Sequence, residues 1–172
     1  MGPEVGALES RLGEWTKTTY NISCSSGTDA LLLALRGLDL QPGQGVIVPS
    51  FTFASSAEVM PIMGATPIFA EIEADSFNLD PNKLDGALAA GKAANIDVVG
   101  IIGVGLFGQP ANYDEISRFA TAHDLWLIDD AAQSFGAYWQ GRPVGQLADV
   151  TCTSFFPAKP LGAYGDGGAV FT

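Results

Sequence analysis

The stretch that decides the fold is IDVVGIIGVGLFGQPANYDEISRFATAHDLWLIDD, residues 96–130. Its first nine residues are almost continuously apolar, which is typical of a buried strand. Residues 112–124 then place apolar side chains at helical spacing, with Ile116, Phe119 and Ala120 on the inward face. An apolar strand at 125–129 closes the unit. Two strands joined by a helix in this way predict an α/β domain.

The rest of the chain alternates in the same manner. We expect strands at 20–25, 45–50, 65–72, 149–156 and 167–172, and helices at 5–15, 26–38, 54–64 and 80–91. In the last of these helices Asp80 is the expected N-cap and Pro81 the first helical residue. This order favours a mainly parallel sheet.

The composition is that of one globular domain. The chain has 172 residues, is 47% apolar and carries a formal net charge of −11, which disfavours nucleic acid and anionic membranes as partners. Its apolar runs are too short to span a bilayer, its start is unlike a signal peptide, and it has two cysteines, so we expect a cytoplasmic protein. The abrupt start and end suggest a fragment of a longer protein.

The residues that follow the expected strands are the candidates for chemistry, because ligands bind at the carboxyl ends of strands in open α/β sheets. Ser26, Gly27 and Thr28 precede a helix whose free N–H groups and dipole suit a phosphate. An ordinary N-cap with a flexible glycine explains the same residues. The charge of Asp29 would compete with an anion at this helix end.

Two acids, Asp129 and Asp130, stand at the end of the strand at 125–129. Adjacent side chains of an extended chain point in opposite directions, so at most one of them faces a given ligand. Solvated turn residues are an equally good interpretation of the pair. A metal site is less favoured than either, because His123 is the single histidine and no cluster of soft ligands accompanies the acids.

One lysine, Lys159, stands in SFFPAKPLGAYGDGG, residues 154–168. Pro157 and Pro160 restrict the backbone on both sides of it, and Phe155 and Phe156 offer apolar walls. The alternative is a solvated loop lysine. The glycines after it lack the strand-to-helix turn of a dinucleotide fingerprint, and no G-x-S-x-G elbow supports serine hydrolysis.

Seven stretches together resemble the DegT/DnrJ/EryC1/StrS family of sugar aminotransferases, which are fold-type I pyridoxal-phosphate enzymes. They are SGTDALLLAL, VPSFTFASSAEV, GATPIFAEI, FNLDP, LFGQPANYDEI, IDDAAQSFGA and CTSFFPAKPLGAYGDGGAVF. The last is most similar to the branch that aminates UDP-linked 3-keto sugars such as 2-acetamido-2-deoxy-3-oxo-glucuronate. The resemblance covers nearly the whole chain and implies a three-layer α/β/α domain with a mainly parallel sheet.

The resemblance implies catalytic roles for two residues. Lys159 matches the internal Schiff-base lysine, whose amine condenses with the aldehyde of pyridoxal 5'-phosphate and later moves a proton. Asp130 matches the acid that keeps the pyridine nitrogen protonated. Lysine at position 159 also separates the chain from dehydratase relatives, which carry histidine there, and therefore favours transamination.

The same resemblance implies further contacts with the cofactor. Gly27 and Thr28 match the phosphate-binding turn, and Ser154 adds a hydroxyl to it. Phe53 matches the aromatic residue over the pyridine ring, and Gln133 matches the residue near the ring hydroxyl. No metal is implied.

Two positions depart from the family pattern. Asp129 stands where relatives often have glutamate, and Phe107 where tyrosine is common. The first leaves the ring contact untouched, and the second removes any role of a hydroxyl there.

The implied reaction transfers an amino group, usually from glutamate, to a keto sugar linked to a nucleotide, on the way to O-antigen and other surface polysaccharides. Members of the family work as homodimers with shared active sites, and residues 1–172 would be an incomplete cofactor-binding large domain that lacks an N-terminal segment and a C-terminal small domain. Two alternatives stay open: a truncated, non-catalytic module that binds a phosphorylated ligand, and another fold-type I reaction such as dehydration.

Overall fold

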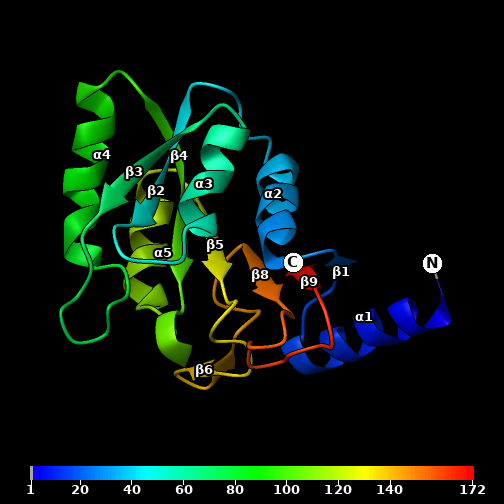
Figure 1. The fold of residues 1–172 in the computed structure, drawn as a ribbon. Coiled ribbons are helices and arrows are strands. Elements are labelled where there is room, and N and C mark those ends of the chain that lie inside the picture. The colour runs from blue at the N-terminus through cyan, green and yellow to red at the C-terminus, as the bar shows by residue number, and fades with distance from the viewer. Residues whose placement is uncertain (1) are drawn as a thin grey trace.

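The computed structural model describes residues 2–172 and shows a seven-stranded sheet covered by helices on both faces (Figure 1). The helices are α1 (Pro3–Thr16), α2 (Gly27–Gly37), α3 (Ser55–Ile62), α4 (Leu84–Ala93) and α5 (Tyr113–Ala122), with 3-10 turns η1 (Pro81–Lys83) and η2 (Leu106–Gly108). The strands of the sheet are β1 (Asn21–Cys24), β2 (Gln44–Pro49), β3 (Thr66–Ala70), β4 (Asp97–Val104), β5 (Trp126–Asp130), β8 (Val150–Ser154) and β9 (Gly168–Phe171). The predicted α/β class is confirmed.

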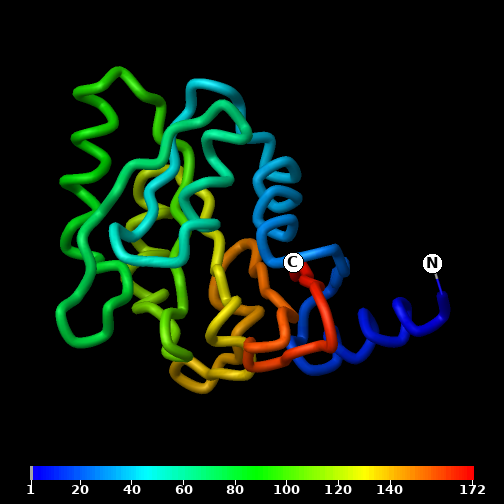
Figure 2. The backbone as a smooth tube through the Cα atoms, in the orientation of Figure 1, coloured from blue at the N-terminus to red at the C-terminus, as the bar shows by residue number. Residues whose placement is uncertain are grey.

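The strand order β1-β9-β8-β5-β4-β2-β3 explains where a site can form. Strands β8, β5, β4, β2 and β3 pair in parallel, and β9 runs antiparallel to both β8 and β1, so β1 points the same way as the parallel strands. The carboxyl ends of six strands therefore lie along one edge. The first and last strands lie side by side, because Tyr20 and Thr172 exchange backbone hydrogen bonds of 2.8 and 3.0 Å (Figure 2).

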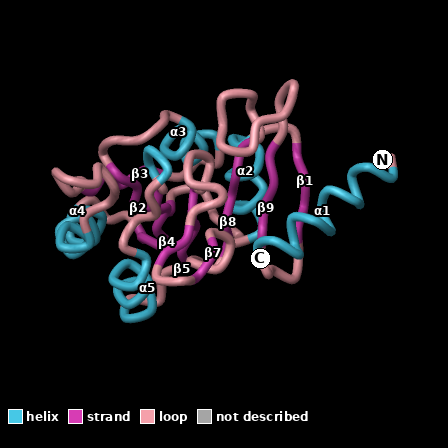
Figure 3. The backbone as a smooth tube through the Cα atoms, turned by 90° about the horizontal axis from the view of Figure 1, so that it is seen from below, coloured by secondary structure: helices cyan, strands magenta, loops and turns pink. Residues whose placement is uncertain are grey.

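Helices α2 and α3 lie on one face of the sheet and α4 and α5 on the other (Figure 3), and an apolar cluster on each face joins them to the sheet. One cluster joins α2 and α3 to the sheet through side chains such as Leu31, Val59 and Ile128. The other joins α4 and α5 to it through Leu84, Ile116 and other side chains. Alternation along each strand separates the clusters, because successive side chains point to opposite faces.

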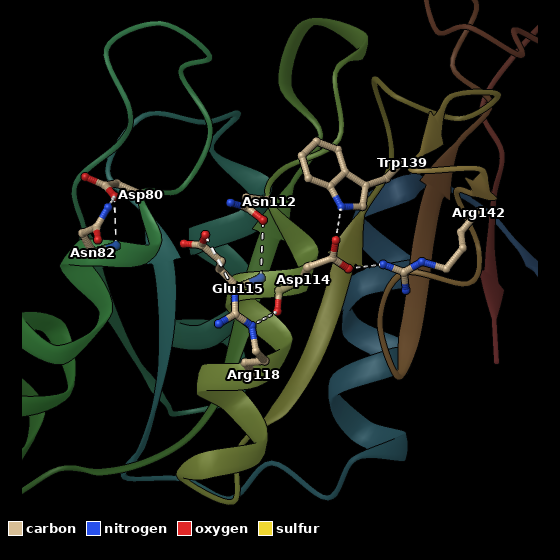
Figure 4. Close-up of polar contacts among 8 residues, drawn as sticks. All are labelled: Asp80, Asn82, Asn112, Asp114, Glu115, Arg118, Trp139 and Arg142. Atoms are coloured by element: carbon tan, nitrogen blue, oxygen red, sulfur yellow. Dashed lines mark hydrogen bonds and ion pairs between the residues drawn. The ribbon is translucent and has the colours of Figure 1, made fainter.

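The helix predicted at 80–91 begins differently from the expectation. Asp80 is an N-cap, and its carboxylate accepts a hydrogen bond of 2.9 Å from the backbone N–H of Asn82 (Figure 4). The first turn, however, is the 3-10 turn η1, and the α-helix begins at Leu84. Such tighter turns are common at helix N-termini.

Within residues 2–172, no helix combines the length and the apolarity needed to cross a membrane.

A two-stranded hairpin of β6 (Tyr138–Trp139) and β7 (Arg142–Pro143) was not predicted from the sequence. It is tied to the start of α5 by Asp114 (Figure 4). The Asp114 carboxylate accepts a hydrogen bond of 3.1 Å from the Trp139 indole N–H and pairs with the Arg142 guanidinium. Two-residue strands are too short to stand alone, so this side-chain anchor holds the hairpin.

We expect Asp114→Ala to lower the free energy of unfolding by about 1 kcal/mol, because two charge-assisted hydrogen bonds are lost at a partly exposed site. The matched control is Glu115→Gln, since Glu115 makes a loose 3.8 Å pair with the exposed Arg118. That control should stay within about 0.5 kcal/mol of wild type. Urea unfolding of the full-length protein measures both values, and equal effects would refute the anchor.

Candidate active site

A cavity of about 480 Å³ lies at the carboxyl ends of the strands. The start of α2, the loop after β2, the end of β5 and the segment after β8 all border it. The lining side chains include Thr28, Phe53, Ser55, Asp130, Gln133, Ser154 and Lys159, together with Gly27. The structure thus brings together the seven residues to which the resemblance gave catalytic or cofactor contacts, and Ser26, Ser55 and Asp166 border the same cavity.

The start of α2 is both an N-cap and a wall of the cavity. The Ser26 hydroxyl accepts a hydrogen bond of 3.1 Å from the Asp29 N–H, as an N-cap does. The Asp29 carboxylate in turn accepts hydrogen bonds from the hydroxyls of Ser25 and Ser26, which lower its pKa. Thr28 and Ser55 share a hydrogen bond of 2.8 Å between their hydroxyls, so α2 and α3 meet at this wall.

Gly27 allows α2 to approach β8 closely. A Cβ atom at Gly27 would lie 2.7 Å from the Ser154 Cβ, inside normal van der Waals contact. The Ser154 hydroxyl, almost fully buried, accepts a hydrogen bond of 3.2 Å from the Phe156 N–H. The cavity wall therefore combines the start of a helix with the hydroxyl-bearing residues Thr28 and Ser154, the chemistry that suits a phosphate.

We expect Gly27→Ala to destabilise the protein by about 1–3 kcal/mol, because α2 must shift away from Ser154 to make room for the methyl group. Gly37→Ala, at the other end of the same helix, is the matched control, since a Cβ there meets nothing within 4 Å. The control should be neutral or stabilising by up to about 1 kcal/mol. Thermal unfolding and cofactor titration of the two variants check this, and equal behaviour would show that the close approach is unimportant.

The Asp130 carboxyl group is buried and has two hydrogen-bond donors of its own. It is 6% exposed and accepts hydrogen bonds from the Ser56 hydroxyl at 2.8 Å and the Ala132 N–H at 3.2 Å. Burial raises the pKa of Asp130, whereas the two donors and the charge of Lys159 oppose that rise. The interpretation of Asp129 and Asp130 as solvated turn residues is wrong, because both are buried within β5.

Lys159 lies in a turn beside the cavity. Its backbone N–H donates to the Phe156 carbonyl at 2.8 Å, and its Nζ lies 5.5 Å from the centre of the Phe53 ring. Phe156 lines the cavity, as predicted, but Phe155 does not: its ring is buried with Leu12 and Phe171 beneath the turn. Side chains of adjacent extended residues point to opposite sides, so only one of the two phenylalanines can face Lys159.

Gln133 borders the cavity and holds the neighbouring loop. Its side-chain oxygen accepts a hydrogen bond of 3.1 Å from the N–H of Phe107, a residue with φ of 56°. The Phe107 ring is 69% exposed and stands close to the rings of Phe51 and Phe77, at 6.5 and 6.0 Å between centres. This exposed aromatic cluster is a feature that the sequence analysis missed.

The serines at the start of α3 were also missed. Ser55 lies within hydrogen-bond distance of Thr28, and Ser56 is fully buried against Asp130. The signal was the small polar pair in SFTFASSAEV at a predicted helix start.

Among the residues that the structure describes, no group of three or more His, Cys, Asp or Glu side chains could hold a metal ion.

Comparisons with known proteins agree with this geometry. The family model described as "DegT/DnrJ/EryC1/StrS aminotransferase family" matches residues 1–172. The chain is 45% identical over its whole length to UDP-2-acetamido-2-deoxy-3-oxo-D-glucuronate aminotransferase of Pseudomonas aeruginosa, and covers 46% of that protein. It is 41% identical to UDP-N-acetyl-3-dehydro-alpha-D-glucosamine 3-aminotransferase of Acidithiobacillus ferrooxidans, again over all 172 residues and 45% of the relative.

Solved structures show the same fold. An aminotransferase of this family from Brucella abortus superposes with a TM-score of 0.97 at 45% identity, over the whole of this chain and 46% of that one. NtdA from Bacillus subtilis, solved with bound cofactor PMP, superposes with a TM-score of 0.91 at 32% identity, over the whole of this chain and 37% of that one. The chain thus spans about half the length of the curated relatives it matches.

Proposed function

The chain belongs to the DegT/DnrJ/EryC1/StrS aminotransferase family, and from this premise we propose that it is the cofactor-binding part of a sugar aminotransferase that uses pyridoxal phosphate. The observation that carries the proposal is the cavity in which Lys159, the buried Asp130 and the start of α2 meet. The residues fit the cofactor: a cationic amine, a buried carboxylate with two donors, and a helix N-terminus beside Gly27.

The assignment of residues follows from their chemistry. Gly27, Thr28 and Ser154 would hold the phosphate through N–H groups and hydroxyls, and Asp130 would hold the proton of the pyridine nitrogen. Phe53 would cover a face of the ring. Gln133 would lie near the ring hydroxyl while it keeps the Phe107 loop in place.

When bound, the cofactor supplies an aldehyde that carries the amino group and a ring that withdraws electrons from the reacting carbon. Lys159 would bind that aldehyde through Nζ and, once freed, take and return a proton at the reacting carbon. The turn between Phe156 and Lys159 holds the backbone at a fixed place for this transfer. Asp130, whose ionised form Ser56, Ala132 and Lys159 favour against the effect of burial on its pKa, would maintain the proton on the ring nitrogen.

The proposed acceptor is a UDP-linked sugar with a ketone at carbon 3. Two of the most similar curated relatives carry names that specify a UDP-linked 3-oxo or 3-dehydro sugar. We propose glutamate as the donor, surface polysaccharide synthesis as the context, and a cytoplasmic homodimer of the longer protein as the working form. In that protein residues 1–172 would be the cofactor-binding large domain, with the rest of the sugar site outside it.

The test is an assay of the full-length protein with glutamate and UDP-2-acetamido-2-deoxy-3-oxo-glucuronate, with the matching 3-oxo-glucosamine and a 4-oxo sugar in parallel. We expect 2-oxoglutarate and a 3-amino sugar from the 3-oxo substrates, with slower turnover of the 4-oxo sugar. A dehydrated sugar as product would support the dehydration alternative instead. Absence of any turnover, together with absence of cofactor binding, would support the non-catalytic alternative.

A further inference from the structure

Two adjacent carboxyl groups of β5 are buried on opposite faces of the sheet. Asp130 faces the cavity, whereas Asp129 is fully buried on the side of α5. There the hydroxyl of Tyr113 donates a hydrogen bond of 2.5 Å to the Asp129 Oδ1. Gly103 of β4 makes room for that hydroxyl, because a Cβ at this position would lie 3.0 Å from it.

The surroundings of the two carboxyl groups are unequal. Asp130 has two hydrogen-bond donors, from Ser56 and Ala132, and feels the charge of Lys159. Asp129 has one neutral donor, and its Oδ2 atom is buried with no hydrogen-bond partner among the described residues. If one negative charge is to be shared between the two groups, it is therefore far more stable on Asp130.

A second buried polar atom without a hydrogen-bond partner among the described residues belongs to the neighbouring strand. Thr151 of β8 is paired in register with Asp129, so the two side chains stand on the same face of neighbouring strands, about 5 Å apart. The Thr151 hydroxyl oxygen is buried and likewise has no hydrogen-bond partner among residues 2–172. The two atoms are not hydrogen-bonded to each other in the structure, so an ionised Asp129 would leave its Oδ2 without a donor to stabilise the charge.

We propose that Asp129 is a positioning residue that retains its proton in a buried Tyr113–Asp129 pair, so that the two carboxyl groups of β5 carry a single negative charge on the face that meets the cofactor. This inference rests on the proposed function, because it matters only where Asp130 must be anionic opposite a pyridine nitrogen. Neither Tyr113 nor Asp129 lines the cavity. The neutral acid acts on the reaction through Asp130 and touches no substrate.

The groups that face Asp129 support this assignment. Burial, opposed by the Tyr113 hydrogen bond and aided by the charge of Asp130, raises the pKa of Asp129 to about 7. Burial raises the pKa of Tyr113 well above its usual value, so its hydroxyl stays a donor. Burial also raises the pKa of the Cys152 thiol, but Cys152 is paired in register with Asp130 and lies on the other face of the sheet. Because the pKa of Asp129 is raised from 3.8 to about 7 in the folded protein, its contribution to the free energy of unfolding is fully present below pH 3.8. That contribution is lost as the pH rises from there through about 7.

Infrared spectroscopy of the full-length protein without cofactor tests where the proton lies. We expect a carboxylic-acid C=O band at about pH 5.5 that disappears in Asp129→Asn, persists in Asp130→Asn, and fades in wild type as the pH rises past the pKa of about 7. Tyr113→Phe removes a donor to the ionised form, so the fading should move to higher pH. A band that survives Asp129→Asn, or no band at acid pH, would overturn the proposal.

A second readout separates this inference from the proposed function. At about pH 6, Asp129→Asn should bind pyridoxal phosphate within about threefold of wild type, since asparagine mimics a neutral acid, whereas Asp130→Asn should not. Equal losses in the two variants would contradict the division of roles. A protein that shows the band but binds no cofactor would contradict the proposed function and leave the proton assignment supported.

Discussion

Lys159→Ala is expected to lower the turnover of the full-length protein by at least about 10³-fold, because both the covalent hold on the cofactor and the proton carrier are lost. Lys159→Arg should lose as much, although it keeps a cation beside Asp130 and the Phe53 ring. Arginine stays protonated and forms no imine, so its failure would separate the amine's chemistry from its charge. Steady-state and single-turnover assays measure these losses.

The control for this series is Lys83→Ala, since Lys83 is an exposed lysine on η1 that does not line the cavity. Its turnover should equal that of wild type. Lys159→Arg should also unfold at the wild-type temperature, which excludes a folding defect. A tenfold loss of rate corresponds to a rise of about 1.4 kcal/mol in the activation free energy. If Lys159→Ala or Lys159→Arg lost no more than that and still aminated the keto sugar, the role of Lys159 would be refuted.

Asp130→Asn is expected to reduce turnover by about 10²–10³-fold, because the amide cannot hold the proton of the pyridine nitrogen by its charge. The same change should leave the cofactor-free protein as stable as wild type or more stable at neutral pH. Burial raises the pKa of Asp130, so the ionised form costs folding free energy that asparagine avoids. Loss of function without loss of stability is the signature of a residue kept for its chemistry.

Thermal unfolding of the cofactor-free protein and the visible absorbance of the loaded protein check the two halves of this prediction. Ser56→Ala is the companion variant, since it removes one donor to Asp130 and retains the carboxylate. Its loss of turnover should be smaller than that of Asp130→Asn and should be greatest at acid pH, because loss of the donor raises the pKa of Asp130. An Asp130→Asn protein with wild-type turnover would contradict the role assigned to Asp130.

Much of the fold followed from local patterns in the sequence. The apolar runs at 96–104 and 125–129 and the helical spacing between them became β4, β5 and α5 within one or two residues. Local signals did not reveal the antiparallel insertion of β9 between β1 and β8, because strand order depends on contacts between distant segments. The β6–β7 hairpin escaped for the same reason: Asp114, far away in sequence, holds it.

The candidate site divides in a similar way. Lys159, Asp130 and Gly27 stood out because their neighbours constrain the backbone or end a strand, and the structure places all three around one cavity. Their roles came from family resemblance and stay proposals. Ser56 and Tyr113 act through contacts with residues 74 and 16 positions away, at 2.8 and 2.5 Å, which no local pattern encodes. The direction of Phe155, buried in the core beneath the turn, likewise depended on packing.

The most direct test of the central claim is to load the full-length protein with pyridoxal phosphate, reduce it with borohydride, and map the modified peptide by mass spectrometry. The account predicts an absorbance band that reduction removes, and one stable adduct on Lys159 in the segment between Phe156 and Gly162. Lys159→Arg should give no adduct. An adduct on another lysine, or none at all in a protein that transfers amino groups, would contradict the account.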